Sequence, residues 1–301
     1  MPKDKMKKSG RRQLERIVDR YRIERGKGFR LRDIDPADTA GLDLEGKEAK
    51  DLLRRGVSML ADLQGKLYAQ DCWGVLIVLQ AMDAAGKDGT IKHVMSGVNP
   101  QGVQVFSFKA PSAEDLDHDF LWRSMKSLPE RGRIGIFNRS YYEEALVVRV
   151  HPELLLKQRL PKKLVTRKIW DERFEDINAF ERYLTRNGIA VLKFFLYVSK
   201  KEQKNRFLER LDMPDKNWKF SMADAKERGF FDDYMTAYED LIRSTSTPWA
   251  PWHVVPADNK WFTRIAVAGT LILALEKLDL QYPKVDKAKR RELAEVRKAL
   301  I

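Results

Sequence analysis

The stretch Trp73–Thr90 reads WGVLIVLQAMDAAGKDGT and decides the fold of this chain. Its first eight residues form an apolar run rich in β-branched side chains, which is typical of a strand buried on both faces of a parallel sheet. Small and glycine residues follow, and a helical pattern begins at Thr90. A strand, a small-residue turn and a helix in this order predict a phosphate-binding loop.

Strands and helices alternate along most of the chain. Further strands are predicted at Val103–Phe106, Arg133–Phe137, Ala190–Val198 and His253–Pro256. Helices are predicted at Glu48–Ala69, Thr90–Met95, Ala113–Ser127, Pro161–Asn187, Lys200–Leu211, Phe230–Ser244 and Trp261–Leu280. Such alternation predicts βαβ units, so we expect the α/β class, with a three-layer α/β/α arrangement and a doubly wound, mostly parallel sheet.

The distribution of charged residues along the 301 positions helps to divide the chain into an arm, a domain and a tail. Residues 1–32 hold thirteen Lys/Arg against four Asp/Glu, whereas the rest of the chain is nearly balanced and the total formal charge is +13. We expect a loosely ordered basic arm over residues 1–45, a domain over residues 46–283 and a charged tail over residues 284–301. Within the domain, the stretch at about 200–245 has helical patterns and no strand, which predicts a helical lid over the site.

Composition also excludes several classes of protein. The single cysteine, Cys72, excludes a disulfide framework or a cysteine-based zinc site within one chain. The longest uncharged apolar run, Ile265–Leu275, is too short to span a bilayer. The N-terminus lacks the apolar segment of a secretory signal. We therefore expect a cytoplasmic protein without a membrane partner.

The predicted loop, residues 81–90, departs from the usual G-x-x-x-x-G-K-[ST] pattern at two positions. Ala81 replaces the first glycine, and Asp88 replaces the hydroxyl residue that usually contacts Mg²⁺. Lys87 keeps its place and would bring a point charge to phosphoryl oxygens. The alternative is a simple structural turn, which the strand and the helix on either side disfavour.

Asp83 needs its own explanation, because a carboxylate inside a phosphate-binding loop repels the ligand unless a cation lies between them. We interpret Asp83 as an Mg²⁺ ligand or as a group that orients the acceptor phosphate. The alternative is a helix-capping or turn residue.

A second set of polar side chains follows the strand Arg133–Phe137. Ligands of doubly wound sheets bind beyond the carboxyl ends of the strands, so this loop and residues 81–90 are expected to converge. Asn138 stands where P-loop kinases often have an Mg²⁺-binding Asp, and Arg139 could clamp a phosphate. Glu143 and Glu144 begin a predicted helix, and compensation of its dipole is the alternative for both.

The predicted lid carries two arginines four residues apart. Arg206 and Arg210 would share one helical face and suit a polyanion, the alternative being a solvated face. Trp218 and Phe220 are expected either to stack on a base or to pack under the lid. The charges of the helix Pro161–Asn187 are interpreted as a solvated face, with a track for a long anion as the alternative. The four histidines have no metal-ligand spacing and are interpreted as structural.

Several segments together resemble the second family of polyphosphate kinases, the polyphosphate:nucleotide phosphotransferases. They are AMDAAGKDGTIK, FNRSYYEE, RFLERLD, NWKF and STSTPWAPWHVVPADNKWFTR, and the resemblance covers roughly residues 30–283. It implies a P-loop kinase fold related to thymidylate kinase, with a helical lid.

The resemblance also implies roles for individual residues. Asp83, Lys87, Asn138 and Arg139 are expected to be catalytic, with Asp83 as the metal ligand. Phosphate and nucleotide groups are expected at Ala84, Ala85, Gly86, Asp88, Gly89, Thr90, Lys92, Glu143, Arg206 and Arg210. The combination of Asn138 and Glu143 resembles the branch that acts on both nucleoside mono- and diphosphates, whereas other members have Asp and Asn at these positions.

The implied reaction moves the terminal phosphoryl group of inorganic polyphosphate to ADP, and also to AMP and GDP, with ATP and GTP among the nucleotides bound. It is reversible and uses Mg²⁺, or Mn²⁺ in its place, and homodimers or homotetramers are usual in the family. An ATP-dependent nucleotide or nucleoside kinase of the same fold is the alternative. A nucleic-acid-binding protein is supported only by the basic arm, so no dedicated nucleic-acid partner is expected.

Overall fold

The structure is a computed structural model, and it describes residues 8–44, 46–215, 217 and 222–301. Its sheet has six strands among these residues, in the spatial order β1-β6-β5-β2-β4-β3. The strands are β1 (Arg22–Ile23), β2 (Gly74–Gln80), β3 (Val103–Ser107), β4 (Ile134–Asn138), β5 (Ile189–Tyr197) and β6 (Trp252–Pro256). Strands β2 to β6 pair in parallel, and β1 pairs antiparallel with β6. The five strands expected from the sequence are therefore confirmed.

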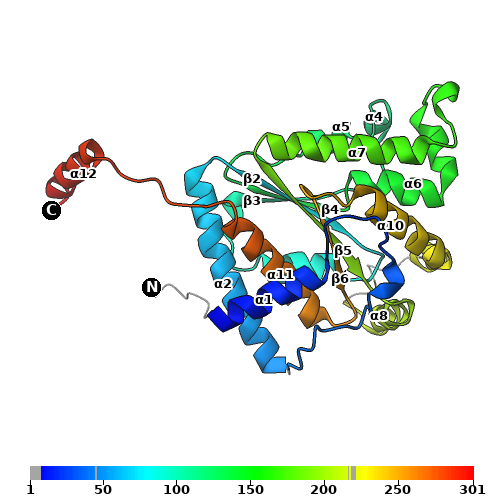
Figure 1. Cartoon of the computed structure of the whole chain (residues 1–301), viewed down its shortest axis with the longest axis horizontal. Coiled ribbons are helices and arrows are strands. Elements are labelled where there is room, and N and C mark those ends of the chain that lie inside the picture. Colours follow the sequence, from blue (N-terminus) through cyan, green and yellow to red (C-terminus); the bar gives the residue numbers. More distant parts are fainter. Residues whose placement is uncertain (1–7, 45, 216, 218–221) are drawn as a thin grey trace.

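Helices cover both faces of the sheet (Figure 1). One face carries α1 (Lys8–Arg20), α2 (Gly46–Gln70), α3 (Lys87–Val94) and α11 (Lys260–Glu276). The other carries α6 (Val147–Val150), α7 (Ile169–Arg186) and α10 (Phe231–Thr245). The expected α/β class and its three-layer, doubly wound arrangement are confirmed.

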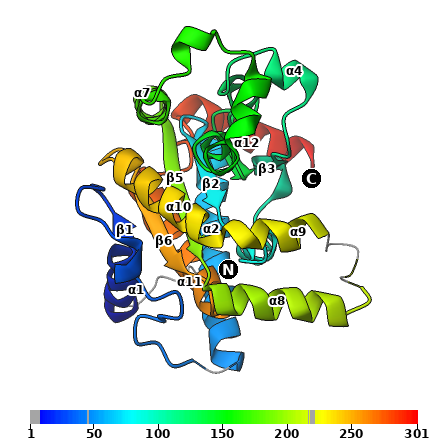
Figure 2. The same cartoon turned by 90° about the vertical axis from the view of Figure 1, so that its right-hand side faces the viewer.

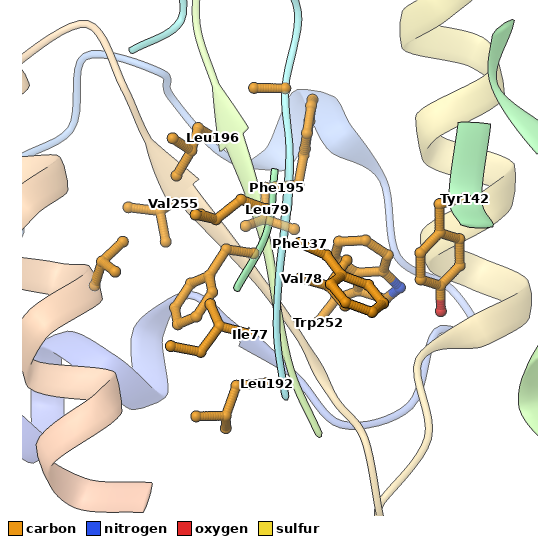
Figure 3. Close-up of a cluster of buried hydrophobic side chains, with 14 of the residues drawn as sticks. Ile77, Val78, Leu79, Phe137, Tyr142, Leu192, Phe195, Leu196, Trp252 and Val255 are labelled. Atoms are coloured by element: carbon orange, nitrogen blue, oxygen red, sulfur yellow. The ribbon is translucent and has the colours of Figure 1, made fainter. Parts of the chain in front are cut away.

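Strand β2 lies in the middle of the core, and all seven of its residues are buried. Neighbours β4 and β5 pair with it on either side, so its side chains meet helices above and below the sheet. Figure 3 shows Val78, Phe137 and Trp252 on the side of the sheet that faces Tyr142, with Ile77 on the other side. Burial on both faces explains why this strand has no alternation of polar and apolar residues.

The N-terminal segment differs from the loosely ordered arm that we expected. From Lys8 it forms α1 and β1, and Ile17, Val18 and Tyr21 are buried. The helix approaches α11 so closely that a Cβ at Gly269 would overlap the side chain of Leu14. In the sequence of α1, apolar residues at helical spacing alternate with arginines. These apolar residues pack against α11.

Two predicted helices are shorter than expected. The range 113–127 holds two separate turns, α4 (Ala113–Leu116) and α5 (Trp122–Met125), because the Asp119 carboxylate accepts a hydrogen bond from Leu121 N and forms a turn between them. The range 161–187 becomes α-helical only at Ile169, since the Thr166 hydroxyl accepts from Lys168 N and makes a turn there. Most of the basic residues assigned to that helix therefore precede it on an exposed segment.

The predicted lid region is helical, as expected, but it has two parts. Helices α8 (Lys200–Asp212) and α9 (Met222–Glu227) project from the body (Figure 2), whereas α10 is a core helix with seven buried residues. Residues Trp218 and Phe220 lie outside the described residues. The tail helix α12 (Lys287–Ala299) has no buried residue.

Short 3₁₀ helices connect the larger elements. They lie at Leu31–Asp33, Pro100–Gly102, Tyr141–Ala145, Pro152–Gln158, Lys162–Leu164 and Arg228–Phe230. Over the described residues, no helix is both long and apolar enough to cross a membrane.

Candidate active site

A cavity of about 960 Å³ opens beyond the carboxyl ends of β2, β3 and β4. Its lining includes twelve of the residues singled out in the sequence: Asp83, Ala84, Ala85, Gly86, Lys87, Asp88, Gly89, Thr90, Asn138, Arg139, Arg206 and Arg210. Lys92 and Glu143 are not part of this lining; Lys92 is exposed on α3 and Glu143 lies behind Arg139. The expected convergence of the loops after two strands is therefore seen.

The loop after β2 adopts the sharp turn that a phosphate cradle needs. Ala84 and Gly86 have positive φ angles of 64° and 107°, and Ala85 N donates to Met82 O at 3.2 Å. Helix α3 begins at Lys87, three residues earlier than predicted, so its first turn belongs to the loop. The N–H groups of a first helical turn have no partner inside the helix, and here they border the cavity, where they favour an anion.

Lys87 lies against the loop that precedes it. Its Nζ donates to Ala81 O at 2.7 Å and to Met82 O at 3.4 Å. Burial lowers the pKa of Lys87 below its ordinary value, while the Asp83 carboxylate acts in the opposite direction. The side chain is thus held with its charged end at the cavity wall.

Arg139 lies between two carboxylates. Its Nη2 donates to Asp83 Oδ1 at 2.9 Å, and its Nη1 lies 3.8 Å from Glu143 Oε2. Burial lowers the pKa of Arg139, but Glu143 and Asp83 together raise it above the ordinary value. Burial also raises the pKa of Glu143, against the opposing charges of Arg139 and Lys87. Arg139 has a positive φ of 64°, a strained backbone that points its side chain toward the loop of Asp83.

Asn138 is tied to the first turn of α3. Its amide Nδ2 donates to Asp88 Oδ1 at 2.8 Å. This bond explains why a carboxylate suits the position where the usual pattern has a hydroxyl residue. It also links the end of β4 to the phosphate loop.

Arg206 has a different environment from the one the sequence suggests. It is only 3% exposed, and its guanidinium donates to the carbonyl oxygens of Ala84, Ala85, Ala257 and Asp258 and to Glu202 Oε1. These five bonds use every N–H of the side chain. Arg206 therefore holds α8 against the phosphate loop, and none of its N–H groups is left to donate to a bound anion in this arrangement. Arg210 remains at the cavity surface.

The four histidines have partners within the fold. His93 Nδ1 lies 2.7 Å from Gly89 O, and His118 stacks on Trp122. His151 Nε2 lies 2.8 Å from Glu227 Oε1, and His253 is buried beside Lys193 O. These contacts agree with the structural roles expected for His118, His151 and His253, whereas His93 also lines the cavity.

Comparison with known proteins identifies the family. The model of the family Polyphosphate kinase 2 (PPK2) matches residues 43–283. The chain belongs to this family. It is 52% identical over 252 residues to an ADP-polyphosphate phosphotransferase of Rhodopseudomonas palustris, which covers 83% of this chain and 87% of the relative. It is 44% identical to an AMP/ADP-polyphosphate phosphotransferase of Meiothermus ruber, over 92% of this chain and all of the relative.

Solved structures agree with this membership. The crystal structure of a polyphosphate kinase 2 from Arthrobacter aurescens has a TM-score of 0.84 and 43% identity, and covers 92% of this chain and 96% of its own. The P-loop kinase fold expected from the sequence is thus confirmed, and this member of the family is a phosphotransferase enzyme.

The structure also adds cavity residues that the sequence analysis missed. Lys109, Lys260 and Arg264 line the cavity with the predicted residues. Arg264 makes no ion pair with a carboxylate among the described residues, and burial together with the neighbouring Arg206 lowers its pKa. Its segment KWFTR contributed to the family resemblance, and the i, i+4 spacing from Lys260 could have marked it.

Phosphotransferases of this family generally need a divalent metal ion. No group of three His, Cys, Asp or Glu side chains in the described parts of the chain could hold one alone. Asp83 nevertheless lines the cavity, is 31% exposed and has one oxygen on Arg139, which leaves its other oxygen for a cation. Ions such as Mg²⁺ are usually held by one or two carboxylates together with substrate phosphates and water, so the residues fit such an ion.

Proposed function

We propose that this enzyme transfers the terminal phosphoryl group of inorganic polyphosphate to ADP, and also to AMP and GDP, in a reversible reaction. The observation that carries the proposal is the convergence of Asp83, Lys87 and Arg139 at one end of a single large cavity. The relatives from R. palustris and M. ruber, whose names include ADP and AMP/ADP as substrates, support the choice of acceptors.

Phosphoryl transfer needs positioning and charge neutralisation more than a reactive side chain. An oxygen of the acceptor's terminal phosphate attacks the last phosphorus of the polyphosphate, and the bond from that phosphorus to its bridging oxygen breaks. The chain shortens by one unit and the acceptor gains one phosphate. Because one phosphoanhydride replaces another, the reaction runs in both directions.

Each site residue has a role in this proposal. The first turn of α3 and Lys87 bind phosphoryl oxygens, and Arg139 stabilises the charge that moves during transfer. Asp83 would hold Mg²⁺, or Mn²⁺ in its place, whose chemistry is to neutralise charge on the phosphates. Asn138, through Asp88, keeps the end of β4 close to the loop. Arg210, Arg264 and Lys109 supply cations along the rest of the wall.

Glu143 supports the use of both AMP and ADP. Its Oε2 lies 3.8 Å from Arg139 Nη1. The combination of Asn138 and Glu143 resembles the branch of the family that phosphorylates both nucleoside mono- and diphosphates. The remaining assignments, namely Ala84, Ala85, Gly89, Thr90 and Lys92 as contacts to phosphate or nucleotide, are proposed on the same family pattern.

The test varies the donor and the acceptor separately. The protein is incubated with Mg²⁺ and either polyphosphate or ATP as donor, and with AMP, ADP or GDP as acceptor, and nucleotides are separated by anion exchange. We expect product from polyphosphate with each acceptor. Transfer from ATP with none from polyphosphate would instead identify an ATP-dependent kinase of the same fold.

Three further properties are proposed, the first on the family resemblance and the other two on the composition and the charge distribution of the sequence. They are a homodimeric or homotetrameric state, a cytoplasmic location and the division into a segment before residue 46, a phosphotransferase domain over residues 46–283 and a charged tail. Light scattering of the purified protein measures the first. Truncation at residue 283 tests the third, because the tail helix α12 has no buried residue and its loss should leave activity intact.

A further inference from the structure

The segment that carries Arg139 is fixed by bonds that reach deep into the core. After Arg139, the Ser140 hydroxyl caps a 3₁₀ turn by accepting from Tyr142 N. The hydroxyls of Tyr141 and Tyr142 both donate to Glu181 Oε1, at 2.9 and 2.7 Å. Two consecutive tyrosines thus donate hydrogen bonds to the same carboxylate oxygen on helix α7.

Lys193 holds the other oxygen of that carboxylate. From the middle of β5, its Nζ donates to Glu181 Oε2 at 2.6 Å, to Tyr142 Oη at 2.9 Å and to Thr245 O at 2.7 Å. All three donors of the ammonium group are therefore used. Lys193 and Glu181 are both 0% exposed, so no solvent shares these bonds.

The same ion pair is bonded to the end of α10, the helix that follows the projecting α8 and α9, through the bond from Lys193 to Thr245 O. Thr245 is the last residue of α10, and its hydroxyl accepts from Trp252 Nε1 at 2.9 Å. Figure 3 shows Tyr142 and Trp252 on the same side of the sheet, and their ring centroids are 4.8 Å apart. The network therefore joins the Arg139 segment, α7, β5, β6 and the base of α10.

A gain in stability alone does not explain why the buried ion pair of Lys193 and Glu181 is present. Removing two charges from water costs more than most buried ion pairs return, and well-packed apolar side chains of similar size are often equally stable. What a fully bonded pair does supply is one defined geometry. The residue before this anchored segment, Arg139, has a positive φ and must be held there by its surroundings.

We propose that the Lys193–Glu181 pair is a positioning device for phosphoryl transfer. Through Tyr141 and Tyr142 it fixes the turn after Arg139 and so sets the direction of the Arg139 guanidinium in the cavity. The inference rests on the proposed function, because it assigns the effect to Arg139 in the transfer step. Neither Lys193 nor Glu181 lines the cavity, so the pair acts only through other residues.

The first test uses Tyr142→Phe and Lys193→Met. Tyr142→Phe removes two bonds of the network and keeps the ring in the core, so it is the variant that folds even where Lys193→Met does not. An interaction made in the transition state affects kcat more than KM, and a displaced group can cost about ten- to a hundredfold in rate. We expect kcat with ADP and polyphosphate to fall by about tenfold or more, with KM for polyphosphate within about twofold.

A double-mutant cycle with Arg139→Ala separates positioning from stability. Groups that act through one another are non-additive, so Tyr142→Phe is expected to lower kcat in the parent protein and to change it little in the Arg139→Ala background. Thr270→Val is the control: it removes a buried hydroxyl on α11 and is expected to leave kcat unchanged at temperatures well below unfolding.

Two results would overturn the inference while the parent enzyme remains active. One is an unchanged kcat in folded Tyr142→Phe, and the other is an equal loss in both backgrounds. No turnover by the parent protein with polyphosphate would overturn the proposed function and this inference together, so the two failures are distinguishable.

Discussion

Lys87 is the side chain on which our proposal for phosphate binding at the loop depends most. Its Nζ donates to Ala81 O and Met82 O at the cavity wall, where an anion bound in the cavity would add a charged partner. Its surroundings are also compatible with the near match to the usual pattern. Ala81 contributes a carbonyl oxygen, which any residue provides, so the missing first glycine is tolerated.

We expect Lys87→Ala to lower kcat by about a hundred- to a thousandfold, the usual effect of removing one group that stabilises transition-state charge. Thermal unfolding should be little changed, because the substitution removes a buried charge that makes two hydrogen bonds to carbonyl oxygens but no ion pair within the described part of the chain. Steady-state rates with ADP and polyphosphate measure the effect, with the exposed Lys50→Ala on α2 as the control. A near-normal kcat would show that the loop does not bind the reacting phosphates.

Arg264 gives a second prediction at this scale. It lies half-buried in the cavity wall near Gly89, without a carboxylate partner among the residues that the structure describes. Arg264→Ala is expected to raise KM for polyphosphate by about tenfold, which corresponds to about 1.4 kcal/mol. Arg54→Ala, an exposed charge change on α2, should leave KM unchanged. An unaltered KM in Arg264→Ala would remove Arg264 from the proposed binding wall.

At the scale of elements, α8 and the phosphate loop form one unit through Arg206. The guanidinium joins two carbonyls of the loop to two carbonyls after β6. The spacing of Arg206 and Arg210 in the sequence indicated a shared helical face, but spacing does not distinguish a side chain that binds carbonyls from one that faces a ligand. Only the packing of α8 against residues 257–258 settles it.

Arg206→Ala is expected to destabilise the protein by about 3–5 kcal/mol, because it leaves carbonyls and Glu202 without their buried partner. Arg206→Lys should recover little of the lost stability, since the three donors of a lysine replace the planar set of five donors of an arginine. Chemical denaturation measures the loss, and Glu209→Gln, on the same helix, is the comparison. Full stability of Arg206→Lys would contradict the role assigned to the five bonds.

Element boundaries also show how far the sequence was informative. The five parallel strands were predicted to within one or two residues. Four of them are largely buried and have a clear apolar pattern, whereas β3 is only partly buried. Helix α7 was predicted eight residues too early, since a turn made by the Thr166 hydroxyl is a local competitor that periodicity does not detect. Helix α1 was missed as a packed element because its apolar residues are interleaved with arginines.

The convergence of the cavity residues was predicted from the sequence, whereas the network of bonds behind Arg139 was not. Asp83 and Arg139, 56 positions apart, were expected to meet because carboxyl ends of neighbouring strands share one edge of the sheet. Lys193 and Glu181 were not singled out, since a lysine inside an apolar strand has no local partner in the sequence. Its partner lies on α7, which only the three-dimensional fold brings close.

At the scale of the whole molecule, His253 couples stability to pH. Burial lowers its pKa from 6.5 to about 3. Below pH 6.5 the unfolded chain therefore binds a proton that the native protein does not bind until about pH 3. The stabilising contribution is complete above pH 6.5 and is lost as the pH falls toward 3.

We expect this one group to reduce the free energy of unfolding by up to about 1.4 kcal/mol for each unit that the pH falls within that window. Urea unfolding at several pH values measures the slope. His253→Gln should flatten it, and His118→Gln, at an exposed and stacked histidine, should leave it as in the parent protein. An identical slope in His253→Gln would contradict the buried neutral state of His253.

Two loops converge in one cavity, and from this we infer that the enzyme transfers a phosphoryl group from polyphosphate to ADP. ³¹P NMR of that reaction tests this central claim most directly. The protein is mixed with polyphosphate, ADP and Mg²⁺, and the end-group and nucleotide signals are followed over time. We predict that ATP signals grow at the expense of polyphosphate. An unchanged spectrum from folded protein would contradict the claim.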